Sequence, residues 1–223
     1  DMPLPLLSAA MDTVTESGTA IALSGDLTND DFSKSIVHDT VKAFGGIDFA
    51  WLHAGHPGPA KVEGMDMDTW DLAVDLNLRT IALTTAEALP EMRKRDNGAL
   101  LYTASIAGIK GSDRSPVYSA MKFGVVGWTR SLAQRVAKDN IRANVICPGG
   151  VDTPMLRTFV ARPDQESTQG MDVEEVIKTR RSAYPLGRPS QPDEQANAAL
   201  FLLSSEASYI SGSVLAVDGA MTA

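Results

Sequence analysis

Apolar residues along the chain alternate between two spacings. Short apolar runs bounded by glycine or polar turn residues predict buried strands, and these runs cover residues 19–23, 47–52, 99–104, 141–146 and 213–217. Longer segments with apolar residues three and four positions apart predict amphipathic helices, and these cover residues 6–15, 32–44, 69–94, 116–138 and 192–203. The second of these has its N-cap within residues 28–31 and ends at the glycines 45–46. Strand and helix therefore follow one another along almost the whole chain.

This alternation predicts an α/β fold, in which a doubly wound parallel sheet is covered by helices on both faces to give three layers. We expect residues 1–223 to form a single domain, because no repeat, low-complexity tract or linker divides them. Between Pro154 and Pro185 the helical periodicity weakens and charged residues become more frequent. That stretch carries no clear prediction of helix or strand.

Charge and composition exclude several kinds of partner. The formal net charge of -8 argues against nucleic acid, whose phosphates are bound mainly by lysine and arginine. No apolar stretch approaches the roughly 20 residues needed to span a bilayer. The single cysteine, Cys147, forms no internal disulfide, which favours a reducing, cytoplasmic setting. The histidines are not spaced with carboxylates or thiols as zinc ligands are, so we expect no metal site.

Three groups of residues are candidates for chemistry. Tyr118 and Lys122 are four residues apart on a predicted helix, which places a phenol and an ammonium on one face. That spacing alone more often belongs to a solvated helix face. Ser105 follows the strand 99–104 at its carboxyl end, where open parallel sheets bind ligands, although serine is also common in turns. Asn77 lies inside the long predicted helix, where asparagine has low propensity.

Taken together, Asn77, Ser105 and the Tyr-Ser-Ala-Met-Lys run at residues 118–122 resemble the Asn, Ser and Tyr-x-x-x-Lys tetrad of the short-chain dehydrogenase/reductase family. Other segments typical of that family lie at residues 25–27, 54–55, 144–154, 187–194, 211–212 and 217–219. The resemblance implies a Rossmann-like fold. It also implies an oxidoreductase that transfers a hydride between NAD(P) and a carbonyl or secondary alcohol.

The proposed chemistry explains why these residue types are needed. A phenol with an ordinary pKa near 10 is a poor base at neutral pH, so Tyr118 needs a nearby cation such as Lys122 to favour its phenolate. Tyr118 then serves as general acid or base, and Ser105 donates a hydrogen bond to the substrate oxygen. By resemblance, Lys122 also holds the nicotinamide ribose and Asn77 supports a water that relays protons.

The resemblance also implies which residues hold the cofactor. Asp26 would meet the adenine, Ala54 and Gly55 would pass close to the cofactor, and Thr153 would contact the nicotinamide carboxamide. The full expected set is Asp26, Leu27, Ala54, Gly55, Tyr118, Lys122, Pro148, Gly149, Val151 and Thr153. For the glycines, turn geometry alone is the alternative interpretation. Either NAD or NADP fits, and NAD is favoured if Asp1 directly follows the family's second strand.

Two features depart from the family pattern. The glycine-rich Thr-Gly-x-x-x-Gly-x-Gly segment, which places a pyrophosphate at a helix N-terminus, does not occur in this sequence. We therefore expect the chain to be N-terminally incomplete, lacking about 35 residues that form the first βαβ unit. His53 stands where the family usually has asparagine. It either caps its strand or contacts the cofactor.

The resemblance leaves the substrate and the assembly open. The segment 155–186 corresponds to the family's substrate loop, where Met155, Phe159 and Tyr184 either line an apolar pocket or pack the loop onto the sheet. One alternative function is reduction of a 3-oxoacyl group on an acidic acyl carrier protein, which would need a basic patch such as residues 93–95 or 180–181. Another is a non-catalytic, cofactor-sensing protein of the same fold. The resemblance further implies a homotetramer.

Overall fold

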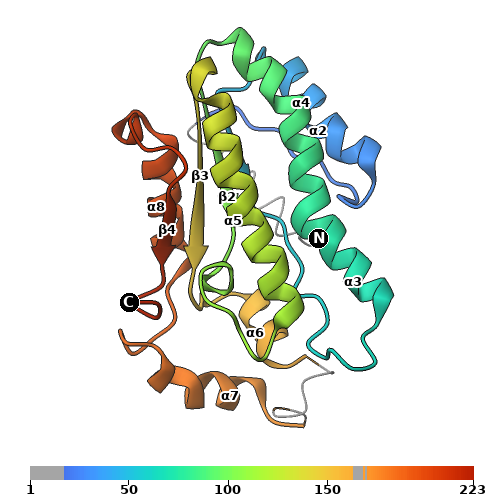
Figure 1. Ribbon diagram of the computed structural model, residues 1–223, viewed down its shortest axis with the longest axis vertical. Coiled ribbons are helices and arrows are strands. Elements are labelled where there is room, and N and C mark those ends of the chain that lie inside the picture. Colours follow the sequence, from blue (N-terminus) through green and yellow to red (C-terminus); the bar gives the residue numbers. More distant parts are fainter. Residues whose placement is uncertain (1–17, 163–167, 169) are drawn as a thin grey trace.

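The computed structural model describes residues 18–162, 168 and 170–223. Their centre is a parallel four-stranded sheet with the order β1-β2-β3-β4 (Figure 1). Its strands are β1 (Phe49–Leu52), β2 (Gly98–Thr103), β3 (Ile141–Pro148) and β4 (Val214–Val217). In register, Ala50 pairs with Leu100, and Leu100 pairs with Ala143. The parallel sheet expected from the alternation of strands and helices is confirmed.

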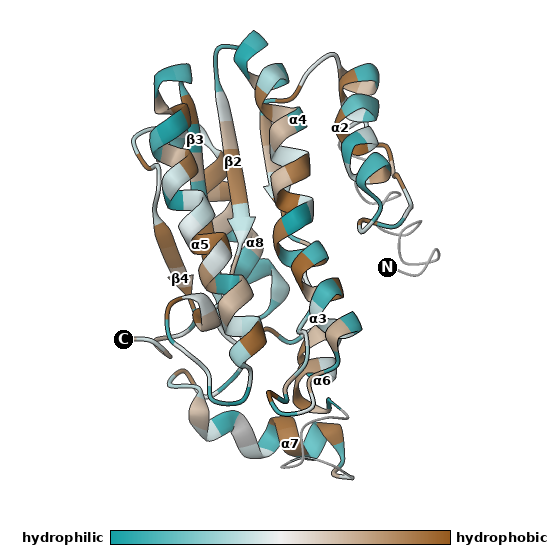
Figure 2. Ribbon diagram, turned by 45° about the vertical axis from the view of Figure 1, so that its right-hand side comes forward, coloured by the Kyte–Doolittle hydropathy of each residue, from teal (hydrophilic) through white to brown (hydrophobic). Residues whose placement is uncertain are grey.

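Helices cover both faces of this sheet. They are α2 (Asp30–Phe44), α3 (Met67–Val74), α4 (Thr80–Lys94), α5 (Pro116–Val136), α6 (Pro154–Val160), α7 (Val173–Thr179) and α8 (Pro192–Leu203). Leu100 and Tyr102 of β2 pack into the cluster formed with α4 and α5, whereas Leu101 packs with Ala199 and Leu202 of α8. Because successive strand residues point to opposite faces, α8 and α5 cover opposite sides of the sheet. Figure 2 shows apolar residues concentrated along β2, β3 and β4, between these helices.

The connections between strands do not all have the same hand. The strand order advances by one place at each step, yet the step from β2 to β3 uses α5 and the step from β3 to β4 uses α8. Since these helices lie on opposite faces, the two crossovers must have opposite hands. The carboxyl end of β3 points toward α6 and α7, which close this end of the molecule (Figure 1).

Local sequence signals explain where two of the helices begin and end. The Asn29 side chain accepts a hydrogen bond from the backbone N–H of Phe32, which caps the start of α2. Gly45 ends that helix in the left-handed conformation, with φ 79°. Pro116 occupies the first turn of α5, where its missing N–H costs nothing. These ends agree with the boundaries predicted from the sequence.

One sequence-based element prediction was wrong. Residues 19–23 pair with no strand among the described residues, and Ile21 and Leu23 are exposed, because an apolar run becomes a strand only beside a hydrogen-bonding neighbour. The helix expected over 69–94 is confirmed as a continuous helical stretch made of α3 and α4, and the sequence did not predict the π-helical turn at Asp75–Arg79 that joins them. Asn77 lies in that turn. The helix expected at 6–15 and the interpretation of Asp1 lie outside the described residues.

Among the described residues, no helix has both the length and the apolar character needed to cross a bilayer.

Truncation of the buried Leu101 should destabilise the fold. This side chain is 0% exposed between β2 and α8, so Leu101→Ala removes packing that no neighbour restores. We expect the free energy of unfolding to fall by about 2–5 kcal/mol, measured by urea denaturation. Leu200→Ala is the control, because Leu200 lies on the outer side of α8 and is 67% exposed. Equal losses in both variants would contradict the assignment of this core layer.

Candidate active site

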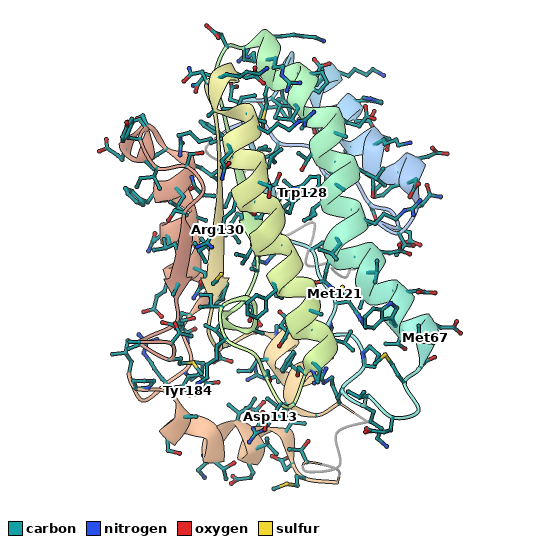
Figure 3. All side chains as sticks on the ribbon, in the orientation of Figure 1. Met67, Asp113, Met121, Trp128, Arg130 and Tyr184 are labelled. Carbon is teal, nitrogen blue, oxygen red and sulfur yellow. The ribbon has the colours of Figure 1, made fainter. Side chains whose placement is uncertain are left out.

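A cavity of about 1380 Å³ opens at the carboxyl ends of β1, β2 and β3. It exceeds the roughly 300–1000 Å³ typical of sites for drug-sized ligands, which leaves space for a dinucleotide together with a second molecule. Its lining includes residues that follow each of the three strands and residues of α5 and α6. Tyr184 and Asp113, which also line it, lie at the end of the molecule near α7 (Figure 3).

The side chains of Ser105 and Tyr118 meet in this cavity. Ser105 follows β2 and begins a short 3-10 turn (Ile106–Gly108), where its Oγ accepts a hydrogen bond from the Ala107 N–H at 3.2 Å. Tyr118 lies in the first turn of α5. Burial raises the pKa of Tyr118 to about 12, and a hydrogen bond with the Ser105 side chain acts in the opposite direction. The two hydroxyls predicted to act together therefore share one pocket.

Lys122 lies one turn further along α5 and is 3% exposed. Its Nζ donates a hydrogen bond to the Thr103 carbonyl oxygen at 3.1 Å and lies 5.4 Å from the centre of the Tyr118 ring. Burial lowers the pKa of Lys122 to about 8. Desolvation thus favours the neutral form of both the lysine and the tyrosine. A charged or polar group added to the cavity will therefore change the protonation equilibria of both side chains.

Asn77 does not line the cavity but lies behind Gly55. Its Nδ2 donates hydrogen bonds to the carbonyl oxygens of Ala73, at 2.8 Å, and of His56, at 2.9 Å. Its Oδ1 is buried with no hydrogen-bond partner among the described residues. A Cβ atom on Gly55 would lie 2.7 Å from that oxygen and 3.0 Å from the Nζ of Lys122. Only glycine leaves this space open, and the π-helical turn directs the asparagine toward it.

The residues predicted to hold a cofactor all line the cavity: Asp26, Leu27, Ala54, Gly55, Tyr118, Lys122, Pro148, Gly149, Val151 and Thr153. Asp26 is held by Thr28, whose backbone N–H and hydroxyl donate to the carboxylate at 2.9 and 2.8 Å. These bonds lower the pKa of Asp26. The Leu27 carbonyl accepts from the Ser33 hydroxyl at 2.7 Å, which fixes the loop before α2.

His53 has features of both interpretations offered from the sequence. Its Nδ1 lies 3.0 Å from the hydroxyl oxygen of Thr103, which also accepts from the Trp51 indole at 2.8 Å. Because an indole N–H only donates, the Thr103 hydroxyl proton is available to His53. Burial, then the charge of Lys122, lowers the pKa of His53. The imidazole is thus tied to the end of β2 and also lines the cavity.

Cys147 lies in the core rather than in the cavity lining. The residue is buried in β3, and burial raises its pKa to about 11. A thiol with that pKa is protonated at neutral pH and is a poor nucleophile. The geometry agrees with the interpretation of Cys147 as a small apolar core residue.

Two contacts of α6 and the residues after it were missed in the sequence. The Phe159 ring stands edge-on to the Tyr118 ring, with centroids 5.2 Å apart and an angle of 65°. Arg162 is buried although it is charged, and its guanidinium donates to backbone and side-chain oxygens of two distant segments. No local pattern reveals such an arginine, because its acceptors are up to 105 residues away.

Comparison with known proteins agrees with this geometry. A family model described as enoyl-(acyl carrier protein) reductase matches residues 5–222. The 3-oxoacyl-[acyl-carrier-protein] reductase FabG of Thermotoga maritima is 33% identical over 196 residues, which are 88% of this chain and 74% of that protein. The chain belongs to the short-chain dehydrogenase/reductase family.

Other members of the family act on different molecules. Cis-4-hydroxycyclohexanecarboxylate dehydrogenase of Sinomonas cyclohexanicum is 34% identical over 205 residues, which are 92% of this chain and 77% of that protein. The structure of NAD⁺-bound xylitol dehydrogenase superposes with a TM-score of 0.87 at 26% identity, covering 97% of this chain and 85% of that one. This short-chain dehydrogenase/reductase is thus an oxidoreductase that transfers a hydride between NAD(P) and a carbonyl or secondary alcohol.

Replacing Lys122 should change how stability depends on pH. The pKa of Lys122 is about 8 in the folded chain and near 10.5 when solvated, so between these values the unfolded chain binds one more proton and folding gains stability as pH rises. Lys122→Met removes this dependence. The quantity to compare is the free energy of unfolding of Lys122→Met minus that of the parent. This difference should be more positive at pH 7 than at pH 10.5, by up to about 3 kcal/mol.

Urea denaturation at the two pH values provides this measurement. Gln134→Met is the control, because Gln134 is exposed on the same helix and removes no titrating group. A Lys122→Met difference that is the same at both pH values would show that the lysine is not desolvated in the folded protein.

Proposed function

We propose that Tyr118 is the general acid and base of the hydride-transfer reaction, with Ser105 and Lys122 as its partners. The proposal depends on one observation: Ser105 and Tyr118 line one cavity together with the buried Lys122, whose Nζ lies 5.4 Å from the centre of the Tyr118 ring. In alcohol oxidation Tyr118 accepts the hydroxyl proton of the substrate, and in carbonyl reduction it returns that proton. The Lys122 ammonium stabilises the phenolate, because an opposite charge nearby favours the charged form of a phenol.

Ser105 has a complementary role toward the substrate oxygen. Its Oγ accepts a hydrogen bond from the Ala107 N–H, so its own proton can be donated to an oxygen in the cavity, either that of Tyr118 or that of a bound substrate. A fixed donor at this position stabilises the negative charge that develops on the substrate oxygen. Asn77 acts from behind Gly55, where its unpaired buried oxygen fits a water that links it to the Lys122 ammonium.

The lining residues fit a nicotinamide cofactor. Lys122 would hold the ribose beside the nicotinamide, Asp26 would meet the adenine, and Thr153 would meet the carboxamide. The bound nicotinamide supplies the atom that accepts or gives the hydride. We propose NAD in preference to NADP, and the NAD⁺-bound state of the xylitol dehydrogenase that superposes on this chain supports that choice.

The substrate is proposed to be a compact, largely apolar ketone or secondary alcohol. The lining of the cavity that holds Ser105 and Tyr118 includes Ile106, Met155, Leu156, Phe159, Val160 and Tyr184. Most of these residues belong to the segment 155–186, which we propose as the substrate loop. The relative that acts on a hydroxycyclohexanecarboxylate agrees with a ring-shaped substrate.

An acyl carrier protein is the less favoured partner. Of the two basic runs considered for docking it, the one at residues 93–95 is neutralised, because Arg93, Lys94 and Arg95 pair with Asp139, Glu91 and Asp48. These ion pairs lower the positive charge that an acidic carrier protein would meet at that run. We further propose a homotetramer, by analogy with the family, and a cytoplasmic setting, supported by the buried reduced thiol of Cys147.

Removal of the Tyr118 hydroxyl tests the mechanism. Tyr118→Phe keeps the ring packed against Phe159 but has no proton to exchange, so we expect kcat to fall by about 10²–10⁴-fold. Cofactor affinity, measured by quenching of tryptophan fluorescence, should change little. Tyr209→Phe is the control, because Tyr209 is fully exposed and far from the site. Equal kcat values for Tyr118→Phe and the parent would remove the proposed function.

A substrate panel tests the predicted apolar wall. Initial rates with cyclohexanol, xylitol and a 3-hydroxyacyl thioester, each with NAD⁺ and NADP⁺, give kcat/KM for every pair. We expect cyclohexanol with NAD⁺ to exceed xylitol by at least about 10-fold, since burying a hydroxyl without a partner costs about 1–3 kcal/mol. Preference for xylitol, or for the thioester, would contradict the proposed substrate class.

A further inference from the structure

A buried cation lies beside the catalytic tyrosine without belonging to the tetrad. Arg162 follows α6 and is 6% exposed. Burying a guanidinium is costly unless its N–H groups are satisfied by hydrogen bonds, so a buried arginine requires a set of well-placed acceptors. The acceptors of Arg162 lie in two segments that are far from it in sequence.

The two segments are the loop after β1 and the residues just before α5. Nη1 of Arg162 lies 3.4 and 3.2 Å from the carbonyl oxygens of Pro57 and Gly58, in the loop after β1. Nη2 donates to the carbonyl oxygen of Arg114 at 3.0 Å and to the hydroxyl of Ser115 at 2.7 Å. One guanidinium thus joins the end of the α6 segment to two loops.

Ser115 connects this arginine to the catalytic helix. It is the residue immediately before α5, a position where serine usually bonds to a free N–H of its own helix. Its side chain makes no such capping bond and instead accepts from Arg162. Tyr118 lies three residues further along, so the hydrogen bond fixes the turn that carries the phenol.

The same guanidinium also holds the aromatic wall of the site. Its central carbon lies 4.6 Å from the centre of the Phe159 ring, within the range of a cation–π contact. The Phe159 ring in turn contacts the Tyr118 ring edge-on, at 5.2 Å between centroids. Arg162, Phe159 and Tyr118 therefore form a continuous series of side-chain contacts that leads from the segment after α6 to the cavity.

We propose that Arg162 is a positioning residue that holds the Phe159 wall against Tyr118 and fixes the start of α5, which sets the distance between the bound substrate and the phenol. The proposal rests on the proposed role of Tyr118. Arg157 cannot substitute for it, since that arginine is partly exposed and pairs with Asp152 and Glu174 on the outer side of the loop.

The charge of Arg162 has a second effect on the phenol. Besides burial, three groups shift the pKa of Tyr118: Ser105 and Arg162 lower it, and Cys147 raises it. The Lys122 Nζ lies 5.4 Å from the centre of the Tyr118 ring. His56, on the other side of Arg162, has its pKa lowered by burial and by that charge. Removing the guanidinium charge should therefore raise the pKa of Tyr118, whereas removing only its hydrogen bonds should not.

Two substitutions separate geometry from charge. Arg162→Lys keeps a cation but cannot bond to both loops, whereas Arg162→Gln loses the charge as well. We expect both variants to lower kcat/KM by about 10²-fold through misplacement of the substrate, with cofactor affinity within a few fold of the parent. Only Arg162→Gln should move the alkaline limb of the pH–rate profile upward.

Arg142 supplies a matched control. Its guanidinium also donates to backbone carbonyls, those of Leu202, Leu203 and Ser204, but it lies near the amino end of β3, opposite the cavity. Arg142→Gln should lower the unfolding temperature about as much as Arg162→Gln, while leaving kcat/KM and the pH profile unchanged. Circular dichroism melts and steady-state kinetics on the four proteins give the comparison.

The outcomes separate this proposal from the assignment of Tyr118. If Arg162→Gln and Arg142→Gln lose stability equally and both keep the parent kcat/KM, Arg162 is only structural and the proposal is overturned. If Arg162→Gln does not fold, Arg162→Lys and Phe159→Leu decide in its place, because both should lower kcat/KM in a folded protein. An active Tyr118→Phe variant would reject the proposed function itself, which none of the Arg162 results can do.

Discussion

Desolvation of two titratable groups at one edge of the sheet is the constraint on which the site depends. Lys122 and Tyr118 lie on the face of α5 that covers the carboxyl ends of the strands, and burial shifts their pKa values to about 8 and about 12. Both shifts favour the neutral forms in the protein without ligands. In the proposed reaction, the positive charge of a bound oxidised cofactor would add to that of Lys122 and favour the phenolate.

At this edge of the sheet, regular secondary structure and irregular backbone position different residues of the site. The strands and α5 fix Ser105, Tyr118 and Lys122, because each follows a strand or lies in the first turns of a long helix. Asn77 needs a π-helical turn, and Gly55 needs the absence of a side chain, to bring an unpaired oxygen beside the lysine. Backbone irregularity inside a helix is costly, so its presence at this position agrees with a functional origin.

The sequence predicted those parts of the molecule whose signals are local. The ends of α2 follow from Asn29 and Gly45, and the start of α5 follows from Pro116, since caps act on their own neighbours. The strand expected at 19–23 was wrong because pairing depends on a neighbour that an apolar run does not specify. The π-helical turn was missed because the apolar spacing continues through it.

In the candidate site, too, the residues that the sequence revealed differ from those that depend on distant parts of the chain. The tetrad and every expected cofactor residue were identified from resemblance, and the structure brings them to one cavity, with Asn77 immediately behind it. Arg162 was not identified, because a buried arginine satisfied by backbone carbonyls leaves no pattern in the sequence.

The acid–base residues and the proposed substrate wall belong to different segments of the chain, which has a consequence for substrate preference. Tyr118 and Lys122 are held by α5, while the wall that we propose faces the substrate belongs to α6 and the segment after it. The Lys122 ammonium bonds to the Thr103 carbonyl of β2, outside that segment. The contact through Arg162 and Ser115, by contrast, couples the loop to the helix that carries the phenol. Substitutions in the segment after α6 should therefore disturb the position of Tyr118 least when they preserve the hydrogen bond between Arg162 and Ser115.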